Sequence, residues 1–225
     1  MPMRRESARD WHSVLIMTVD DPILPAFAEG TARTVALAHA ALRRRPRRHG
    51  KRGTILVGID GPSGSGKSTL ADQVAAALDA APIVRMDDLY PGWDGLAASV
   101  PRLVRWVLSP ALHGRIPRYR RYDWHRGGFA EWRAVRRHRY LVVEGAGSTC
   151  GTAREYYAVR VFVDGDPDER MRRALRRDGE MFRPHWTRWA RQEAALFGAD
   201  RTRRAAHVTL ITSSVSERQN CTVRP

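Results

Sequence analysis

Cysteine is scarce in this chain of 225 residues, which has Cys150 and Cys221 and no others. Two cysteines so far apart exclude a disulfide framework or a cysteine-based metal cluster, and they suit a reducing compartment. Long apolar runs are also missing, since none approaches the roughly 18 residues that a membrane-spanning helix needs. The first ten residues lack the apolar segment and cleavage site of a secretion signal. We therefore expect a cytoplasmic protein with no membrane partner.

Lysine is scarce relative to arginine. Lys51 and Lys67 are the only lysines among 39 basic residues, which outnumber 24 acidic ones and give a formal net charge of +15. Arginine suits phosphate and carboxylate recognition, so a nucleotide or a nucleic acid is one interpretation. Compositional bias at solvated positions is the other, and we favour it for any single surface arginine. No nucleic-acid-binding motif accompanies the charge and the basic residues are dispersed, so a nucleic-acid partner stays open but is not favoured.

Length and patterning divide the chain into three regions. In the first, 1–52, apolar side chains recur at helical spacing and predict an amphipathic helix over 25–45, followed by a basic connection at 43–52. The second region, 53–212, has the pattern of one α/β domain. The third, 213–225, is a polar tail. The oligomeric state is not predicted by any of these patterns.

The domain alternates between strand and helix patterns. Short apolar stretches at 54–60, 82–86, 139–143, 159–163 and 207–211 predict strands. Helical patterns lie between them, beginning with one at 69–80. Such alternation is typical of a parallel sheet with helices on both faces. The predicted fold class is therefore α/β.

Glycine is concentrated in the turn between the first predicted strand and the helix that follows it. Its spacing, Gly-x-x-x-x-Gly-Lys-Ser, is that of a phosphate-binding P-loop, or Walker A motif. Glycines let backbone amides turn toward phosphate oxygens, and the helix points its positive end there. Lys67 would reach the β- and γ-phosphates, and Ser68 would ligate the Mg²⁺ that accompanies ATP. The expected ATP-binding residues are Gly61, Pro62, Ser63, Gly64, Ser65, Gly66, Lys67, Ser68 and Thr69; an ordinary glycine-rich turn is the alternative.

Acidic residues end two of the other predicted strands. Asp87 and Asp88 follow 82–86, and Glu144 follows 139–143. Ligands of open α/β sheets bind at this edge, where a carboxylate could accept the proton of an attacking hydroxyl or hold a metal ion. Glu144 completes a Walker B-like pattern. The alternative for each acid is that it only caps the following turn.

Two further segments supply arginine and aromatic side chains. The helical pattern over 168–178 places Arg170, Arg173 and Arg177 on one face, as in a lid that neutralises phosphoryl charge and excludes water. Its alternative is a solvated basic face. Tyr119–Trp132 mixes aromatic rings, arginines and His125 in what we expect to be an irregular loop, suited to a flat acceptor or serving only as an anchored surface loop.

Together these segments resemble the uridine kinase and phosphoribulokinase-like branch of the P-loop kinases over about 54–210. The resemblance rests on residues 58–69, Met86-Asp87-Asp88-Leu89-Tyr90, Tyr122-Asp123-Trp124, Val143-Glu144-Gly145, Phe162-Val163-Asp164 and the arginine helix. The resemblance implies the P-loop NTPase fold with a doubly wound, five-stranded parallel sheet. It also implies that the acid at Asp87 is the acceptor-activating base and that the acid at Glu144 helps to hold Mg²⁺.

The remaining site residues follow from the same resemblance and segments. Tyr122 and Trp124 would line the acceptor pocket together with Asp87, Tyr90 and His125. Lys67, Arg173 and Arg177 would share the catalytic work.

The predicted activity is transfer of the γ-phosphate of ATP to a hydroxyl of a nucleoside, uridine- or cytidine-like, or a similar small alcohol. Its alternatives are a nucleic-acid-associated P-loop NTPase, whose binding salt would weaken steeply, and a kinase-like protein with a non-nucleoside acceptor. A degenerate kinase that binds ATP without catalysis is disfavoured, because every expected acid and base is present.

Overall fold

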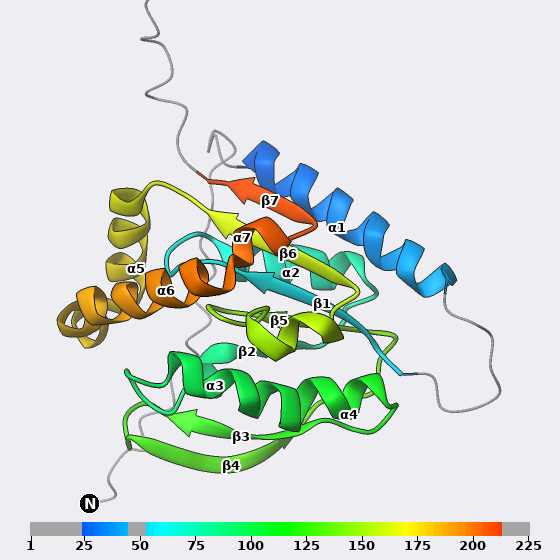
Figure 1. Ribbon diagram of the computed structural model, residues 1–225, viewed down its shortest axis with the longest axis horizontal. Helices are drawn as coiled ribbons and strands as arrows, with labels where there is room; N and C mark the ends of the chain where they lie inside the picture. Colours follow the sequence, from blue (N-terminus) through cyan, green and yellow to red (C-terminus); the bar gives the residue numbers. More distant parts are fainter. Residues whose placement is uncertain (1–23, 45–52, 213–225) are drawn as a thin grey trace, which may run out of the picture.

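A parallel five-stranded sheet forms the centre of the molecule (Figure 1). The structure is a computed structural model that describes residues 24–44 and 53–212. The strands are β1 (Ile55–Asp60), β2 (Ile83–Arg85), β5 (Tyr140–Glu144), β6 (Val159–Asp164) and β7 (Val208–Ile211), in the spatial order β2-β5-β1-β6-β7. All five lie within one residue of the predicted stretches. The predicted α/β fold and parallel sheet are confirmed.

Strand β1 is buried along its whole length because β5 and β6 pair with its two edges. Ile55, Val57 and Ile59 pack into the hydrophobic cluster on one face of the sheet, and Leu56 packs into the cluster on the other. A strand covered on both faces needs apolar side chains at nearly every position, which explains the apolar run that precedes Asp60. The loop that leaves β1 therefore lies at the middle of the sheet, where the strand order reverses and ligands bind in such folds.

Helices α1 (Leu24–Arg44) and α2 (Lys67–Ala77) cover one face of the sheet. Phe27 and Ala38 of α1 are buried in the same cluster as Leu70 and Val74 of α2. The helix predicted over 25–45 is confirmed, and it is part of the core layer although it precedes the P-loop region. The predicted basic connection lies mostly, and the tail entirely, outside the described residues.

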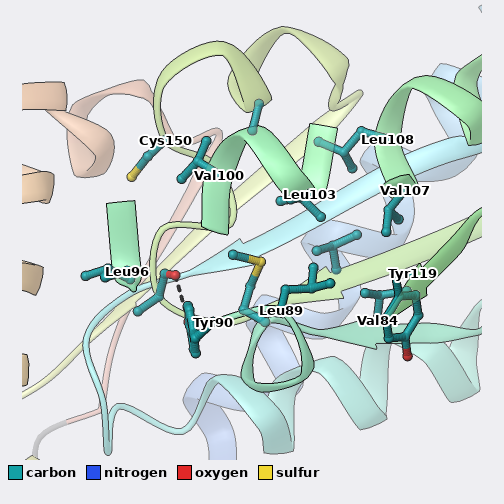
Figure 2. Close-up of a cluster of buried hydrophobic side chains, with 14 of the residues drawn as sticks. Val84, Leu89, Tyr90, Leu96, Val100, Leu103, Val107, Leu108, Tyr119 and Cys150 are labelled. Carbon is teal, nitrogen blue, oxygen red and sulfur yellow. Dashed lines mark hydrogen bonds between the residues drawn. The ribbon is translucent and has the colours of Figure 1, made fainter. Parts of the chain in front are cut away.

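The opposite face carries α3 (Leu96–Leu103), a π-helical turn (Val104–Leu108) and α4 (Ser109–Leu112). Figure 2 shows Val100, Leu103 and Val107 from this run packed in one cluster with Leu89 and Tyr90. Helices α5 (Pro167–Phe182), α6 (Trp186–Asp200) and α7 (Thr202–Ala205) follow β6, and α5 and α6 lie beside the carboxyl ends of the strands (Figure 1). Helices therefore cover both faces, as predicted.

The segment predicted as an irregular loop, Tyr119–Trp132, is instead a β-hairpin of β3 (Arg118–Asp123) and β4 (Gly128–Ala134). That expectation was wrong. The two strands shift register between Arg120 and Tyr122, which breaks the simple alternation that identifies a strand. The carboxylate of Asp123 closes the turn by accepting hydrogen bonds from the amides of His125 and Arg126.

The arginine-rich helix predicted over 168–178 is confirmed as part of α5, which Asp166 caps by accepting from the amides of Asp168 and Glu169. Gly179 breaks its regular geometry with φ 60° and ψ −141°. Three short 3₁₀ turns complete the described fold: Met86–Asp88, Gly151–Tyr156 and Arg183–His185. None of the helices in the described ranges is both long and apolar enough to cross a membrane.

Candidate active site

The P-loop turns from β1 into the first turn of α2, as its sequence predicts. Gly66 stands at the N-cap of α2 with φ 92°, a left-handed conformation that other residues rarely adopt. Gly64 has φ 76°, and a Cβ there would lie 2.0 Å from the carbonyl oxygen of Arg170. Lys67 folds over the loop, where its Nζ donates to the carbonyl of Pro62 at 2.9 Å. The turn therefore has the glycine conformations and the lysine placement of a phosphate cradle.

Asp60, which sequence reasoning missed, fixes the backbone where β1 runs into this loop. Its side chain is fully buried and accepts hydrogen bonds from the amides of Gly61, Gly147 and Thr149 and from the Thr149 hydroxyl, at 2.7 to 2.9 Å. Burial raises the pKa of Asp60, and these hydrogen bonds oppose that rise. The carboxylate thus ties the start of the P-loop to the loop that follows β5. Its position directly before Gly61 was the available signal.

Ser68 and Glu144, the predicted magnesium ligands, lie side by side. The Ser68 hydroxyl donates to Glu144 Oε1 at 3.2 Å, although the two residues are 76 positions apart in sequence. Arg85, another residue that sequence reasoning missed, bonds the same oxygen at 2.8 Å and also Asp72. The described residues contain no cluster of three or more His, Cys, Asp or Glu side chains built for a metal ion. One hydroxyl and one carboxylate fit Mg²⁺, which takes its remaining ligands from water and phosphate oxygens.

Asp87 stands at the carboxyl end of β2, in the 3₁₀ turn Met86–Asp88, with its side chain exposed to solvent. Although its side chain reaches solvent, the protein atoms around Asp87 displace part of its water, and this desolvation and the negative charge of Glu144 raise the pKa of Asp87 to about 6, while Arg177 and Lys67 oppose the rise. Glu144, Arg177 and Lys67 are therefore near enough for their charges to act on Asp87. A carboxylate with this pKa is ionised at neutral pH and can accept a proton, as a general base must.

Asp88 has a different surrounding from its neighbour. Its Oδ2 accepts from the Tyr119 hydroxyl at 2.9 Å and lies 3.6 Å from Arg133. Both partners belong to the β3–β4 hairpin, so Asp88 anchors the hairpin to the end of β2. Burial raises the pKa of Asp88, and the bond to Tyr119 opposes the rise.

Removing the bond between Tyr119 and Asp88 should lower the stability of the protein and leave kcat nearly unchanged. We expect Tyr119→Phe to lower the free energy of unfolding by about 1 to 2 kcal/mol, because it removes one hydrogen bond to a charged acceptor. Urea denaturation followed by circular dichroism measures the loss. If kcat fell a hundredfold in Tyr119→Phe while stability held, Asp88 would have a direct part in the reaction.

Aromatic rings form a wall next to Asp87, and we define this aromatic wall as Trp93, Trp124, Phe182, His185 and Trp189. Trp124 donates from Nε1 to the carbonyl of Asp87 at 3.0 Å. Trp93 stacks on His185 with ring centroids 4.3 Å apart and lies 4.6 Å from Trp124. Gln192 further fixes Trp93 by donating to its carbonyl at 2.7 Å. The wall joins the hairpin tip to the α5–α6 corner, and its central residue, Trp93, was not among the predicted site residues.

The other predicted acceptor residues differ in their placement. Tyr122 packs edge-on against Trp124 at 5.2 Å and so lies next to the wall. His125 is exposed in the hairpin turn. Tyr90 is only 2% exposed, and its hydroxyl donates to the carbonyl of Ala146 inside the core (Figure 2). Tyr90 therefore contacts the wall through the Trp189 ring, and its contact with an acceptor stays a prediction.

The two arginines predicted to act from a lid, Arg173 and Arg177, have different contacts. Arg173 bonds the carbonyls of Gly64 and Thr212 as well as Glu169, so it fastens α5 to the P-loop. Arg177 pairs with Asp178, which raises the pKa of Arg177, and its charge acts on Asp87 and Glu144. The structure thus brings Lys67, Ser68, Asp87, Glu144 and Arg177 to one site. Arg173 lies beside them with its donors in use.

Comparisons with known proteins support the fold. No family profile matches the chain. Over 41 residues it is 54% identical to a nicotinamide riboside kinase of Eremothecium gossypii, a match that covers 18% of this chain and only 17% of that protein. A possible uridine kinase from Bacillus stearothermophilus has a similar structure, with a TM-score of 0.54, 17% identity and coverage of 79% of this chain and 97% of the other.

A D-glycerate 3-kinase from Cryptococcus neoformans var. grubii is comparably similar, with a TM-score of 0.53 and 12% identity over 81% of this chain and 95% of the other. At such low identity, a shared architecture demonstrates the fold alone. The resemblance stated from the sequence is confirmed at that level: this chain has the fold of the P-loop kinases.

Proposed function

We propose that this protein is an ATP-dependent small-molecule kinase that transfers the γ-phosphate to a hydroxyl of a nucleoside or a similar small alcohol. The observation that carries the proposal is the meeting of Lys67, Ser68, Glu144 and Asp87 at one edge of the sheet. A nucleotide-binding loop alone is common to many activities. A solvent-exposed carboxylate with a pKa of about 6 beside that loop adds a base for an acceptor hydroxyl.

In this mechanism the P-loop amides and Lys67 hold the β- and γ-phosphates. Ser68 and Glu144 would hold Mg²⁺, which when bound neutralises phosphate charge. Asp87 accepts the proton of the acceptor hydroxyl as that oxygen attacks the γ-phosphorus, and ADP leaves. Arg177 faces the same site and balances negative charge that develops on the phosphoryl group.

The aromatic wall supports a flat acceptor. Trp124 bonds the backbone of Asp87 and Tyr122 packs edge-on against Trp124, and aromatic rings bind planar groups by stacking. A nucleoside, with a planar base attached to a sugar hydroxyl, suits this combination. The nucleoside and riboside kinases among the similar proteins agree with this choice, whereas the glycerate kinase acts on an acceptor without a ring.

The test is phosphoryl transfer by the purified full chain, with ADP release measured across a panel of nucleosides, sugars and small hydroxy acids. We expect a nucleoside to be phosphorylated, and Lys67→Ala to lower kcat/KM for ATP by about a hundredfold or more, since it removes the cation for the transferring phosphate. An EDTA-treated sample should regain activity with Mg²⁺. Full activity of Lys67→Ala, or ATP hydrolysis stimulated by nucleic acid without any small acceptor, would contradict the proposal.

A further inference from the structure

Glu193 of α6 is a buried carboxylate that the proposed mechanism does not use. It is 2% exposed, and one of its oxygens, Oε1, accepts three hydrogen bonds. The donors are the amide of Ser63 at 2.9 Å, the hydroxyl of Ser63 at 2.7 Å and Nε1 of Trp189 at 2.8 Å. Burying a charged group is unfavourable unless such bonds compensate. The P-loop and α6 must therefore keep the relative position in which Ser63 and Trp189 donate to Glu193.

Two of these donors belong to the third residue of the P-loop, which lies 130 positions from Glu193 in sequence. The amide and the hydroxyl of Ser63 thus point toward α6. On the other side, the carbonyl of Ser63 accepts from Arg170 of α5 at 3.4 Å. A cavity of ≈ 300 Å³ lies between the loop and α6, lined by Pro62, Glu193 and Phe197 among others. This hollow opens toward solvent, and beside it the hydrogen bonds of Glu193 join the loop to α6.

The third donor links Glu193 to the aromatic wall. The Trp189 ring meets Tyr90 edge-on at 4.8 Å and Trp93 at 6.2 Å. Trp93 in turn contacts Trp124, whose indole nitrogen bonds the carbonyl of Asp87. A continuous series of contacts therefore runs from the P-loop through Glu193 and the wall to the backbone of the proposed base.

We propose that Glu193 is a positioning residue that sets the conformation of the P-loop at Ser63 and couples it to the aromatic wall, so that binding of ATP orders the acceptor side. Such coupling is reciprocal, so an acceptor that orders the wall tightens ATP binding by the same factor. The inference rests on the proposed function only in that the P-loop binds ATP.

The experiment uses the full chain with Mg²⁺ and a non-hydrolysable ATP analogue as the probe. Isothermal titration calorimetry gives the affinity, and hydrogen exchange of the amides at 91–95 and 122–129 reports on the wall. In the wild type we expect the analogue to slow exchange in both segments. In Glu193→Ala we expect affinity to fall about tenfold to a hundredfold, because three donors lose a charged acceptor, and the wall to lose its response.

Three matched variants separate positioning from general damage. Glu193→Gln keeps an acceptor oxygen at the same reach and should bind within about threefold of the wild type. Trp189→Phe keeps the bonds between Glu193 and Ser63 but removes the hydrogen bond from Trp189 to Glu193. Affinity for the ATP analogue should therefore hold within about threefold, while the analogue should no longer slow hydrogen exchange in the wall. Arg191→Ala, an exposed position on the same helix, should match the wild type in both measurements.

Distinct results contradict distinct claims. Unchanged affinity in a folded Glu193→Ala, or full protection of the wall in Trp189→Phe, would overturn the role of Glu193. If Glu193→Ala does not fold, the Trp189→Phe result still decides the coupling. A wild-type protein that does not bind the analogue would instead overturn the proposed function itself.

Discussion

Asp87→Asn is expected to lower kcat by about 10²- to 10⁴-fold, the range that a positioned general base contributes. Asparagine has nearly the same shape but cannot take the proton of the acceptor hydroxyl. Affinity for the ATP analogue should stay within a few fold, since Asp87 is not in the P-loop. Steady-state kinetics with the best acceptor, together with calorimetry of the analogue, measure the two effects. The adjacent variant Asp88→Asn is the matched control, because Asp88 bonds the hairpin.

The pKa of Asp87 also predicts how activity depends on pH. Because the base must be ionised, kcat/KM should fall about tenfold per pH unit as the pH drops below about 6. This acid limb should be absent from the residual activity of Asp87→Asn. An acid limb that persists in the variant would show that another group is titrating.

The same raised pKa has a consequence for stability. A folded-state pKa of about 6, above the ordinary 3.8, means that ionising Asp87 opposes folding, so its favourable contribution below pH 3.8 is lost as the pH rises through 6. Because the Asp87 side chain is exposed, solvent screens part of this cost. Without nucleotide, Asp87→Asn should therefore have a slightly higher Tm than the wild type above pH 6. The difference should shrink toward zero near pH 4. Thermal unfolding across this pH range measures the difference in Tm. A lower Tm for Asp87→Asn than for the wild type at pH 8 would contradict the claim that ionised Asp87 opposes folding.

Glu144→Gln is expected to have the second large effect, a loss of kcat/KM of about a hundredfold at low Mg²⁺ that high Mg²⁺ partly restores. Glu144 is the carboxylate next to Ser68, and an amide is a poorer ligand for Mg²⁺. The readout independent of activity is the affinity for Mn²⁺ in the presence of ADP, measured by electron paramagnetic resonance. Unchanged Mn²⁺ affinity would remove Glu144 from the metal site.

Glu144→Gln should also move the acid limb of the pH profile of kcat/KM. The charge of Glu144 is the second cause that raises the pKa of Asp87, after desolvation. Removing that charge should shift the limb of kcat/KM to lower pH. Asp72→Asn is a suitable control, because Asp72 is the other, largely exposed partner of Arg85 and its charge is not among the main causes that shift the pKa of Asp87. Its acid limb should stay near that of the wild type.

Local patterns in the sequence determined much of this protein. The five strands, the α1 and α5 helices and the P-loop were predictable because buried strands, amphipathic helices and glycine turns each depend on residues close together in the chain. Ser68, Asp87 and Glu144 could be named for the same reason, since each lies close to the end of a strand or the start of a helix.

Tertiary structure decided which of these residues work together. The spatial order β2-β5-β1 brings Ser68 within 3.2 Å of Glu144 and places Asp87 in the field of both Glu144 and Lys67. It gave the side chains of the neighbours Asp87 and Asp88 different surroundings, because the Asp88 carboxylate bonds Tyr119 of the hairpin whereas Asp87 bonds the hairpin through its backbone carbonyl. It buried Tyr90, and it gave Glu193 a partner 130 residues away. No local pattern carries such information, because strand order and helix packing bring together side chains whose sequence neighbours are unrelated.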